Sequence, residues 1–192
     1  MEMTSPMEMM GNESFRPLKR VEYDRLVADG CFEDERVELL FGLVVPMTPI
    51  SPSHAESTDE VRDALSRALG PRARVMSQRP FGASEISEPL PDVFVVPTGE
   101  YRKEHPTRAY LVVEVSQSSL SRDRGLKAKL YGLSQVDEYW IVNLVKDVVE
   151  VYRDPKEGSW QTTLTYPRGT VLSLAAVPDV EIAVSDLLPP IE

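Results

Sequence analysis

The sequence predicts an α/β (α+β) fold with a central mixed β-sheet flanked by helices and a β-rich C-terminal part. Two main stretches, 53–69 and 120–133, space their apolar residues as helices do. Short runs rich in Val, Ile and Tyr surround these stretches, and such runs alone fill the last third of the chain. The chain has 192 residues, which fits one domain with a substantial core. We therefore expect a single domain over 16–192.

The N-terminal segment 1–15 does not match this pattern. It contains five of the seven Met residues and shows no periodicity, so we expect a disordered or loosely attached tail. It also lacks a basic stretch leading into an apolar one, so we expect no signal peptide. No apolar run approaches the roughly 20 residues that a membrane span requires. Because Cys31 is the only cysteine, an internal disulfide and a cysteine-rich zinc site are excluded. These features predict a cytoplasmic protein.

The charge is negative in total but unevenly distributed. The formal net charge of −10 argues against a protein that coats nucleic acid in general. Segments 61–81 and 101–131 nevertheless contain 12 of the 21 Lys and Arg residues and only 4 of the 31 Asp and Glu residues. These segments flank two strands that carry carboxylates, a location that would suit a phosphate backbone. A solvated surface of mixed charge explains them equally well.

The first half of the chain predicts a short helix, a hairpin and a long helix. Residues 19–28 form a helical candidate, and 37–47 read as two strands on either side of Gly42. Ser53 and Glu56 have the spacing of a capping box that opens a helix, which Gly70-Pro71 ends. Val61, Leu65 and Ala68 would be the buried stripe of this helix, with His54 on the same face. Such a histidine is more often a packing residue than a functional one, and both readings stay open.

Further strands complete the sheet. A strand is expected at 74–79, followed by a loop at 81–90. The next two strands are expected at 91–96 and 109–116, with a polar connection at 98–107 between them. Further strand patterns are at 138–143, 148–153, 160–166, 171–174 and 180–184.

Each of the strands 91–96 and 109–116 carries one acidic residue, Asp92 and Glu114. Residues 109–116 are almost continuously apolar, as in a strand covered on both faces. A charge there is costly unless it is paired or bound to a metal. If the two strands are neighbours, Asp92 and Glu114 meet at one point of an apolar sheet. Two carboxylates in such a place are the beginning of a magnesium site.

The helix at 120–133 follows directly. Its spacing predicts Leu126, Leu130 and Leu133 as the buried stripe, with Asp123, Lys127 and Tyr131 beside it. Lys127 would then lie at the edge of the core, one turn of chain past Glu114. Carboxylates that hold a metal, with a Lys that orients water or stabilises developing charge, are an arrangement typical of nucleases. Taken alone, Asp123 and Lys127 are more simply explained as a helix ion pair.

Several motifs in order resemble one family, the Uma-type restriction endonucleases of the PD-(D/E)XK nuclease superfamily, from about residue 20 to about 188. The motifs are Glu38-Leu39-Leu40-x-Gly42, Met47 with Ser51-Pro52-Ser53-His54, Pro91-Asp92-Val93, Val113-Glu114-Val115-Ser116-x-Ser118, Asp123-x3-Lys127-x3-Tyr131 and Val136-x-Glu138-Tyr139-Trp140.

The resemblance implies a restriction-endonuclease-like core and Mg²⁺-dependent hydrolysis of DNA, with Mn²⁺ as a substitute. By position, Asp92 and Glu114 match the metal ligands of the family and Lys127 its helical lysine. Glu38 and His54 match further catalytic positions, while Tyr131, Asp123 and Ser116 would support the site. The resemblance also favours a homodimer, because restriction-type nucleases commonly pair two sites to cut both strands.

The chain departs from the wider pattern at two places. Ser116 stands where the superfamily usually has its lysine, so Lys127 can replace that lysine only if its helix packs directly over Glu114. Phe41 and Leu43 stand where acidic residues are usual. Two alternatives therefore remain beside the nuclease: a catalytically inactive nuclease-fold module for DNA binding or assembly, and an interaction protein that self-associates through its β-rich C-terminal part.

Overall fold

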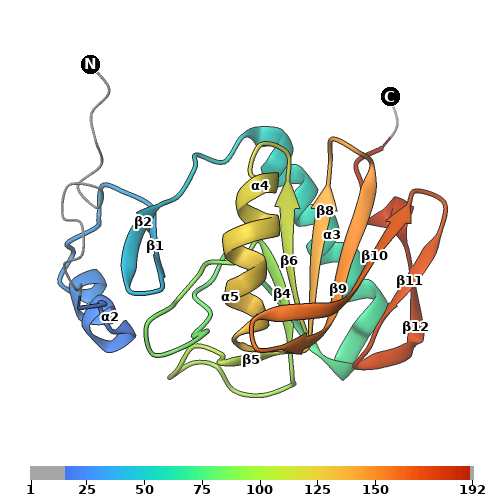
Figure 1. The fold of residues 1–192 in the computed structure, drawn as a ribbon. Helices are drawn as coiled ribbons and strands as arrows, with labels where there is room; N and C mark the ends of the chain where they lie inside the picture. The colour runs from blue at the N-terminus through green and yellow to red at the C-terminus, as the bar shows by residue number, and fades with distance from the viewer. Residues whose placement is uncertain (1–15, 191–192) are drawn as a thin grey trace.

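The computed structural model describes residues 16–190 and contains a central six-stranded sheet (Figure 1). The strand order is β10-β9-β8-β6-β4-β3. Only β6 and β8 pair in parallel, and every other neighbouring pair is antiparallel. The expected mixed sheet is therefore confirmed. Its strands are β3 (Arg74–Ser77), β4 (Val93–Val96), β6 (Leu111–Ser116), β8 (Glu138–Asn143), β9 (Val148–Lys156) and β10 (Ser159–Pro167).

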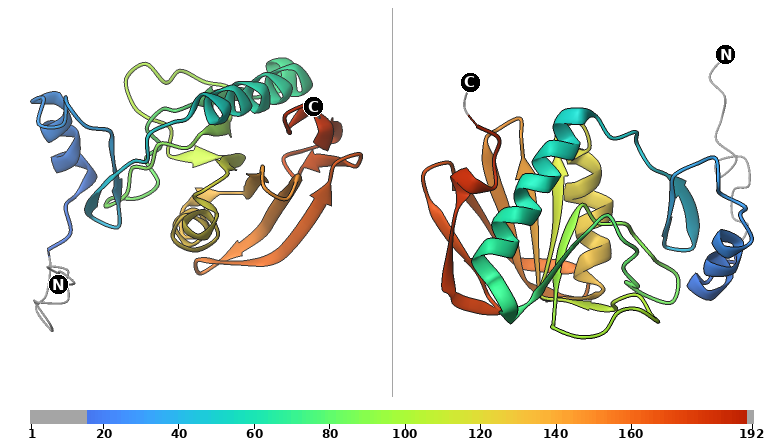
Figure 2. Two further views of the ribbon diagram at one scale, coloured as in Figure 1. Left: turned by 90° about the horizontal axis from the view of Figure 1, so that it is seen from above. Right: turned by 180° about the vertical axis from the view of Figure 1, so that it is seen from behind.

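Helices cover the two faces of this sheet (Figure 2). Helix α3 (Pro52–Leu69) packs on one face, where Val61 and Leu65 join a core that includes Val113 and Val115 of β6. A second helix lies on the other face and consists of α4 (Leu120–Arg122), a π-helical turn (Asp123–Lys127) and α5 (Ala128–Gly132). As expected for a strand covered on both sides, all of β6 is buried.

The N-terminal elements lie to one side of the sheet (Figure 1). Helix α2 (Arg20–Ala28) is followed by the hairpin of β1 (Val37–Leu40) and β2 (Leu43–Pro46). Phe41 and Gly42 form the hairpin turn with φ values of 51° and 80°, as a two-residue turn between twisted strands requires. The expected helix and hairpin are both present.

The C-terminal part is rich in strands, as predicted. Strands β11 (Val171–Leu174) and β12 (Val177–Ala183) form a separate antiparallel pair, followed by a 3₁₀ turn at Val184–Asp186. This pair packs beside α3 and contributes to the same core (Figure 2). A small parallel bridge of β5 (Arg108–Ala109) and β7 (Gln135–Val136) was not expected from the sequence.

Several boundaries differ from those expected. Helix α3 begins at Pro52, and its N-cap is Ser51 rather than Ser53, because a proline is well suited to the first helical position. Strand β3 ends at Ser77, two residues early, since Gln78 has a φ of 48°. Strand β12 starts three residues earlier than the expected 180.

The buried face of the helix at 120–133 was predicted wrongly. Leu126 and Leu133 are 40% and 54% exposed, whereas Lys127 and Tyr131 are buried next to Leu130. The π-helical turn is the reason, because its wider hydrogen-bond spacing rotates the following residues relative to a regular α-helix.

None of the helices within residues 16–190 is long and apolar enough to cross a membrane. The predicted N-terminal tail lies outside the described residues.

Candidate active site

Most of the residues singled out in the sequence line one cleft of about 240 Å³, namely Glu38, His54, Asp92, Glu114, Asp123 and Lys127, whereas Ser116 and Tyr131 do not line it. Glu38 comes from β1, His54 from the first turn of α3, and Asp92 from the residue before β4. Glu114 lies near the C-terminal end of β6, and Lys127 comes from the π-helical turn. Five separate segments thus deliver side chains to the cleft.

The register of β4 and β6 brings the two carboxylates together. Val93 pairs with Val113, which sets Asp92 opposite Glu114 at the end of the antiparallel ladder. Asp92 Oδ2 accepts a hydrogen bond from the backbone N–H of Val115 at 2.8 Å. The backbone N–H of Asp92 in turn donates to Glu114 Oε2 at 3.4 Å. The two side chains are therefore held by the ends of the strands themselves.

Glu114 is the more buried of the two carboxylates. The hydroxyl of Tyr131, one helical turn after Lys127, donates to Glu114 Oε1 at 2.7 Å. Burial raises the pKa of Glu114 to about 8, although Lys127 and the Tyr131 hydrogen bond act in the opposite direction. A cation that enters the cleft would stabilise the ionised form of this carboxyl group and so lower its pKa.

Lys127 lies between two carboxylates. Its Nζ is 2.6 Å from Glu38 Oε2 and 3.3 Å from Glu114 Oε1. Burial lowers its pKa, but the charges of Glu114 and Glu38 outweigh burial and raise the pKa above the ordinary value. The helix does pack over Glu114, which is the condition that the Ser116 departure imposed. The ion pairs of Lys127 with described residues are with these two glutamates and not with Asp123.

Glu38 has a second basic partner, Arg122 of α4, through its other carboxylate oxygen. The backbone N–H of Leu90 donates to Glu38 Oε2 at 3.4 Å. Glu38 is 1% exposed, so these contacts replace water around a fully buried charge. Through these ion pairs, Glu38 links the β1–β2 hairpin to the helix that carries Lys127.

His54 contacts the strand ends rather than packing only in the core. Its Nε2 is 2.9 Å from the carbonyl oxygen of Val115 and 3.2 Å from Asp92 Oδ2. The hydrogen bond with Asp92 raises the pKa of His54, against the opposing effect of burial. The position of the ring follows from α3 starting at Pro52, which directs its first turn toward the cleft.

The supporting residues form a chain of hydroxyls and a carboxylate at the edge of the cleft. Ser119 donates to Asp123 Oδ2 at 2.5 Å, and its Oγ lies 3.4 Å from that of Ser116. Burial raises the pKa of Asp123, while the serine hydroxyls act to lower it. Asp123 therefore lines the cleft and Ser116 lies beside it, and the ion pairs of Lys127 are with Glu38 and Glu114.

The oxygen donors suit a magnesium ion that keeps part of its water. Within residues 16–190, no three His, Cys, Asp or Glu side chains cluster closely enough to hold a metal by themselves. Asp92 and Glu114 provide two carboxylates, and the carbonyl oxygen of Val115 lies beside them. Mg²⁺ typically binds one or two carboxylates and fills its remaining positions with water and substrate oxygens. The donor set fits such an ion.

Arg122 and Ser119 were not predicted as site residues. Arg122 lies about one turn before Lys127, near the exposed basic residues of the same helix. Its pairing with Glu38 requires the hairpin to fold against this helix, and no local sequence pattern predicts a contact between segments so far apart. Ser119 stands in the polar turn 117–119, where its spacing of four from Asp123 was an available signal.

Both the sequence and the fold of the chain are similar to those of known proteins. The Uma2 family model, described as a putative restriction endonuclease, matches residues 21–185. The fold is similar to the crystal structure of a putative nuclease belonging to DUF820 from Anabaena variabilis, with a TM-score of 0.69 and 17% sequence identity. That similarity covers 89% of this chain and 97% of the other. No curated protein matches the sequence. Because the family match spans most of the chain, the protein belongs to the Uma2 family of putative restriction endonucleases.

Proposed function

We propose that the protein is a metal-dependent endonuclease that hydrolyses DNA phosphodiester bonds in the cleft of Asp92, Glu114 and Lys127. One observation carries this proposal: the ammonium group of Lys127 lies 3.3 Å from Glu114 although residue 116 is a serine. A cation on the helix thus occupies the neighbourhood of the acidic pair. The family match agrees with this reaction class.

Each side chain has a defined task in the proposed site. Asp92 and Glu114 would hold Mg²⁺, or Mn²⁺ in its place, and the bound ion would supply Lewis-acid stabilisation of the phosphate oxygens. Lys127 would position the attacking water and stabilise the negative charge that develops on the phosphate. Glu38 holds Lys127 in place at 2.6 Å. His54 fixes Asp92 and can hold a water molecule near it.

A plasmid-nicking assay tests the activity. Supercoiled plasmid is incubated with the protein and Mg²⁺, Mn²⁺ or EDTA, and the nicked and linear forms are measured over time. We expect metal-dependent nicking that Asp92→Ala abolishes and that Lys127→Ala reduces by roughly 10²–10³-fold. Lys129→Ala is the matched control, since Lys129 lies two residues away on the exposed side of the same helix. Equal loss in Lys129→Ala would show that the effect is not specific to the cleft.

A second assay separates the nuclease from the inactive DNA-binding or assembly module. A metal that binds the native state must raise its melting temperature. We expect Mg²⁺ and Mn²⁺ to stabilise the wild type but not Asp92→Ala. Equal melting of the wild type with and without metal, together with DNA binding, would favour the inactive module.

We propose in addition that the active form is a homodimer, since two centres are needed to cut both strands in one binding event. Sedimentation at increasing protein concentration, with and without a DNA duplex, measures the assembly state. A protein that stays monomeric in both conditions while it linearises plasmid would contradict this proposal.

A further inference from the structure

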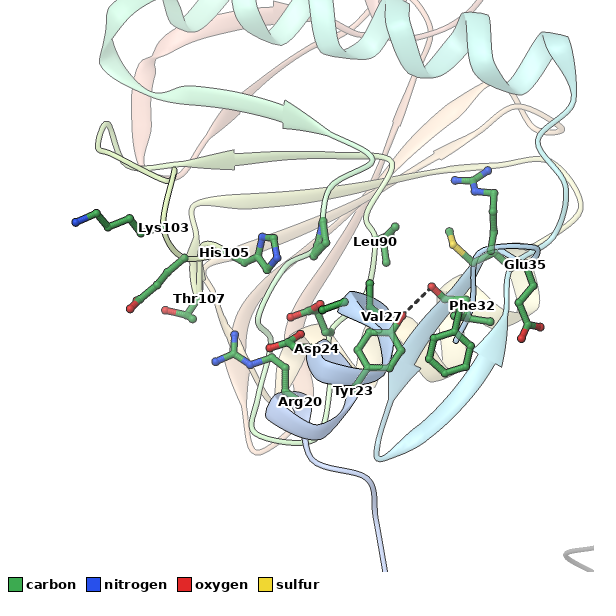
Figure 3. A pocket seen from close by; sticks show the side chains of 17 residues that line it. Arg20, Tyr23, Asp24, Val27, Phe32, Glu35, Leu90, Lys103, His105 and Thr107 are labelled. Atoms are coloured by element: carbon green, nitrogen blue, oxygen red, sulfur yellow. Dashed lines mark hydrogen bonds between the residues drawn. The ribbon is translucent and has the colours of Figure 1, made fainter. Parts of the chain in front are cut away.

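A second and larger pocket lies beside the cleft and has no role in the proposed reaction (Figure 3). Its volume is about 770 Å³, within the usual range for small-molecule sites. It is lined by α2, the start of the β1–β2 hairpin, the segment around Glu88 and the loop that includes Lys103 and His105. In Figure 3, Tyr23, Val27 and Phe32 lie on one side and Lys103, His105 and Thr107 on the other.

The lining of this pocket includes a buried carboxyl group that lacks a hydrogen-bond donor. Glu88 is 3% exposed, and its Oε2 has no hydrogen-bond partner among residues 16–190. Burial and the nearby charge of Asp24 raise the pKa of Glu88 to about 7, with Arg20 acting in the opposite direction. Buried polar atoms in folded proteins are nearly always hydrogen-bonded. Above this pKa Glu88 is a carboxylate with an unpaired oxygen, and the pocket then favours a ligand that donates hydrogen bonds.

The walls of the pocket are suited to a flat ring. Tyr23 and Phe32 pack with their ring centroids 5.8 Å apart, and Val27 is a further apolar residue of the lining. The hydroxyl of Tyr23 donates to the carbonyl oxygen of Val37 at 3.1 Å, which fixes the ring in position. Tyr23 itself is 3% exposed and supports Phe32, the partly exposed ring of the pair, on which a nucleobase can stack.

The rim carries basic groups, one of which depends on a glycine. A side chain at Gly82 would collide with the guanidinium of Arg20, so the absence of a Cβ there leaves room for Arg20. Lys103 and His105 are exposed on the opposite side, where Figure 3 shows both side chains. Together these groups can contact the phosphates of a nucleotide whose base is inside.

The pocket and the proposed catalytic cleft are neighbours that share lining residues. Leu90 and Met47 line both, and the segment Glu88-Pro89-Leu90-Pro91-Asp92 runs from one to the other. The prolines restrict the residues before them to extended conformations, so the four-residue step spans at most roughly 14 Å. Glu88 and Asp92 therefore lie on one short segment. In a complex with DNA, they could contact neighbouring nucleotides of the same DNA strand.

We infer that this pocket takes the extruded base of a nucleotide close to the cut, and that Glu88 selects a base with an exocyclic amino group. The amino group of such a base donates to the carboxylate, as in the pairing of Glu with N4 of cytosine. Uracil and thymine present an oxygen at that position, which cannot donate to an ionised Glu88 and instead faces its negative charge. The inference deepens the proposed function and rests on it, because the strand must pass the cleft of Asp92.

Nucleotide binding can be measured without cleavage. Saturation-transfer NMR in EDTA at pH 8, where Glu88 is mostly ionised, compares dCMP with dUMP, two nucleotides whose bases are of equal size and differ mainly at position 4 and in the proton on N3. We expect dCMP to bind with its base protons in contact with the protein and dUMP to bind roughly fivefold or more weakly. Glu88→Gln should remove this preference. Asp92→Ala should retain it, since that variant changes only the neighbouring cleft.

A second pair of variants tests the pocket without changing its charge. Val27→Phe narrows the pocket from the exposed side of α2 and should weaken dCMP binding, whereas Val21→Phe lies on the same helix outside the lining and should not. Equal binding of dCMP and dUMP, or dCMP binding that is unaffected by both Glu88→Gln and Val27→Phe, would overturn the inference. A Glu88-dependent rise in melting temperature with Mg²⁺ alone, without nucleotide binding, would also overturn it and indicate a cation site.

The nicking assay separates this failure from failure of the proposed function. If plasmid is cut but no base preference appears, only the pocket inference is wrong. If the base preference depends on Glu88 but no metal or substrate gives cleavage, the proposed hydrolysis is wrong.

Discussion

We propose that Lys127 replaces the lysine that the superfamily resemblance leads one to expect on the strand, at the position of Ser116. Ser116 is on the same face of β6 as Glu114, two residues along, and its Oγ lies near Ser119 and Asp123. A lysine at 116 and a lysine at 127 would therefore reach the same carboxylate from two directions. The proposed hydrolysis requires a lysine ammonium group close to Glu114, and this group can come from either the strand or the helix.

This equivalence predicts a rescue. Lys127→Ala should lose roughly 10²–10³-fold of the nicking rate, and adding Ser116→Lys should restore part of it. Ser116→Glu in the same background is the control and should restore nothing, because it adds negative charge beside Glu114. The plasmid assay measures all three variants, with circular dichroism to check that each is folded. A double variant that is folded but no more active than Lys127→Ala would contradict the equivalence.

Glu88 gives a prediction about stability and pH. Because burial raises its pKa from the ordinary 4.5 to about 7, the folded protein binds more protons than the unfolded chain between these values. The contribution of Glu88 to wild-type stability therefore falls as pH rises through this window, by an amount on the order of 2–3 kcal/mol. Glu88→Gln removes this loss, so the variant should gain on the wild type between pH 4.5 and pH 8.

Urea denaturation at pH 5 and pH 8 measures the difference. The exposed Glu56→Gln provides the control and should change the free energy of unfolding equally at both values. A Glu88→Gln variant whose advantage over the wild type is the same at pH 5 and pH 8 would show that Glu88 does not titrate between these values, contrary to a pKa of about 7.

At the scale of single elements, the strands could be predicted well from the sequence and one helix could not. The β-branched runs that become β4, β6 and β8 are easily recognised in the sequence, because a strand covered on both faces is apolar at most positions. The proximity of Asp92 and Glu114 followed from these strands being neighbours. The helix at 120–133 was assigned a regular period, whereas its π-helical turn shifts the buried face from Leu126 to Lys127.

The corrected helix phase predicts which leucine matters. Leu130 is 2% exposed and Leu126 is 40% exposed. Leu130→Ala should therefore lower the free energy of unfolding by about 2–5 kcal/mol. Leu126→Ala should change it by less than about 0.5 kcal/mol, as a surface substitution does. Chemical denaturation measures both variants. If both substitutions lowered the free energy of unfolding by similar large amounts, Leu126 would be buried, as the regular α-helical spacing predicted.

The contacts between distant segments are what the sequence does not provide. The pairing of Glu38 with both Lys127 and Arg122 joins residues more than 80 positions apart, and no local pattern determines it. The contact of His54 with Val115 and Asp92 likewise requires α3 and β6 to pack together. The family motifs included Glu38, Lys127 and His54 but not Arg122, and the arrangement of all four depends on the packing of the whole domain.

The C-terminal strands illustrate this dependence at the scale of the whole molecule. Every residue of the proposed site precedes Gly132, so the segment after residue 170 contributes no chemistry. Its buried apolar residues nevertheless belong to the same core as Val61 and Leu65 of α3. These are Leu172, Leu174, Val177, Val180, Ile182, Val184, Leu187 and Leu188. Because α3 also carries His54, the C-terminal part supports the cleft indirectly.

Removal of residues 171–192 should therefore unfold the protein and abolish nicking. Each buried Leu, Ile or Val contributes roughly 1.5–3 kcal/mol, and the loss of several exceeds the roughly 5–15 kcal/mol by which domains are stable. Thermal unfolding followed by circular dichroism should show one cooperative transition for the full chain and none for the truncated one. The same core argument predicts that a single substitution, Leu174→Asp, has a similar effect, since Leu174 is fully buried. A truncated chain that melts cooperatively and still nicks plasmid would show instead that the sheet and α3 fold without the C-terminal strands.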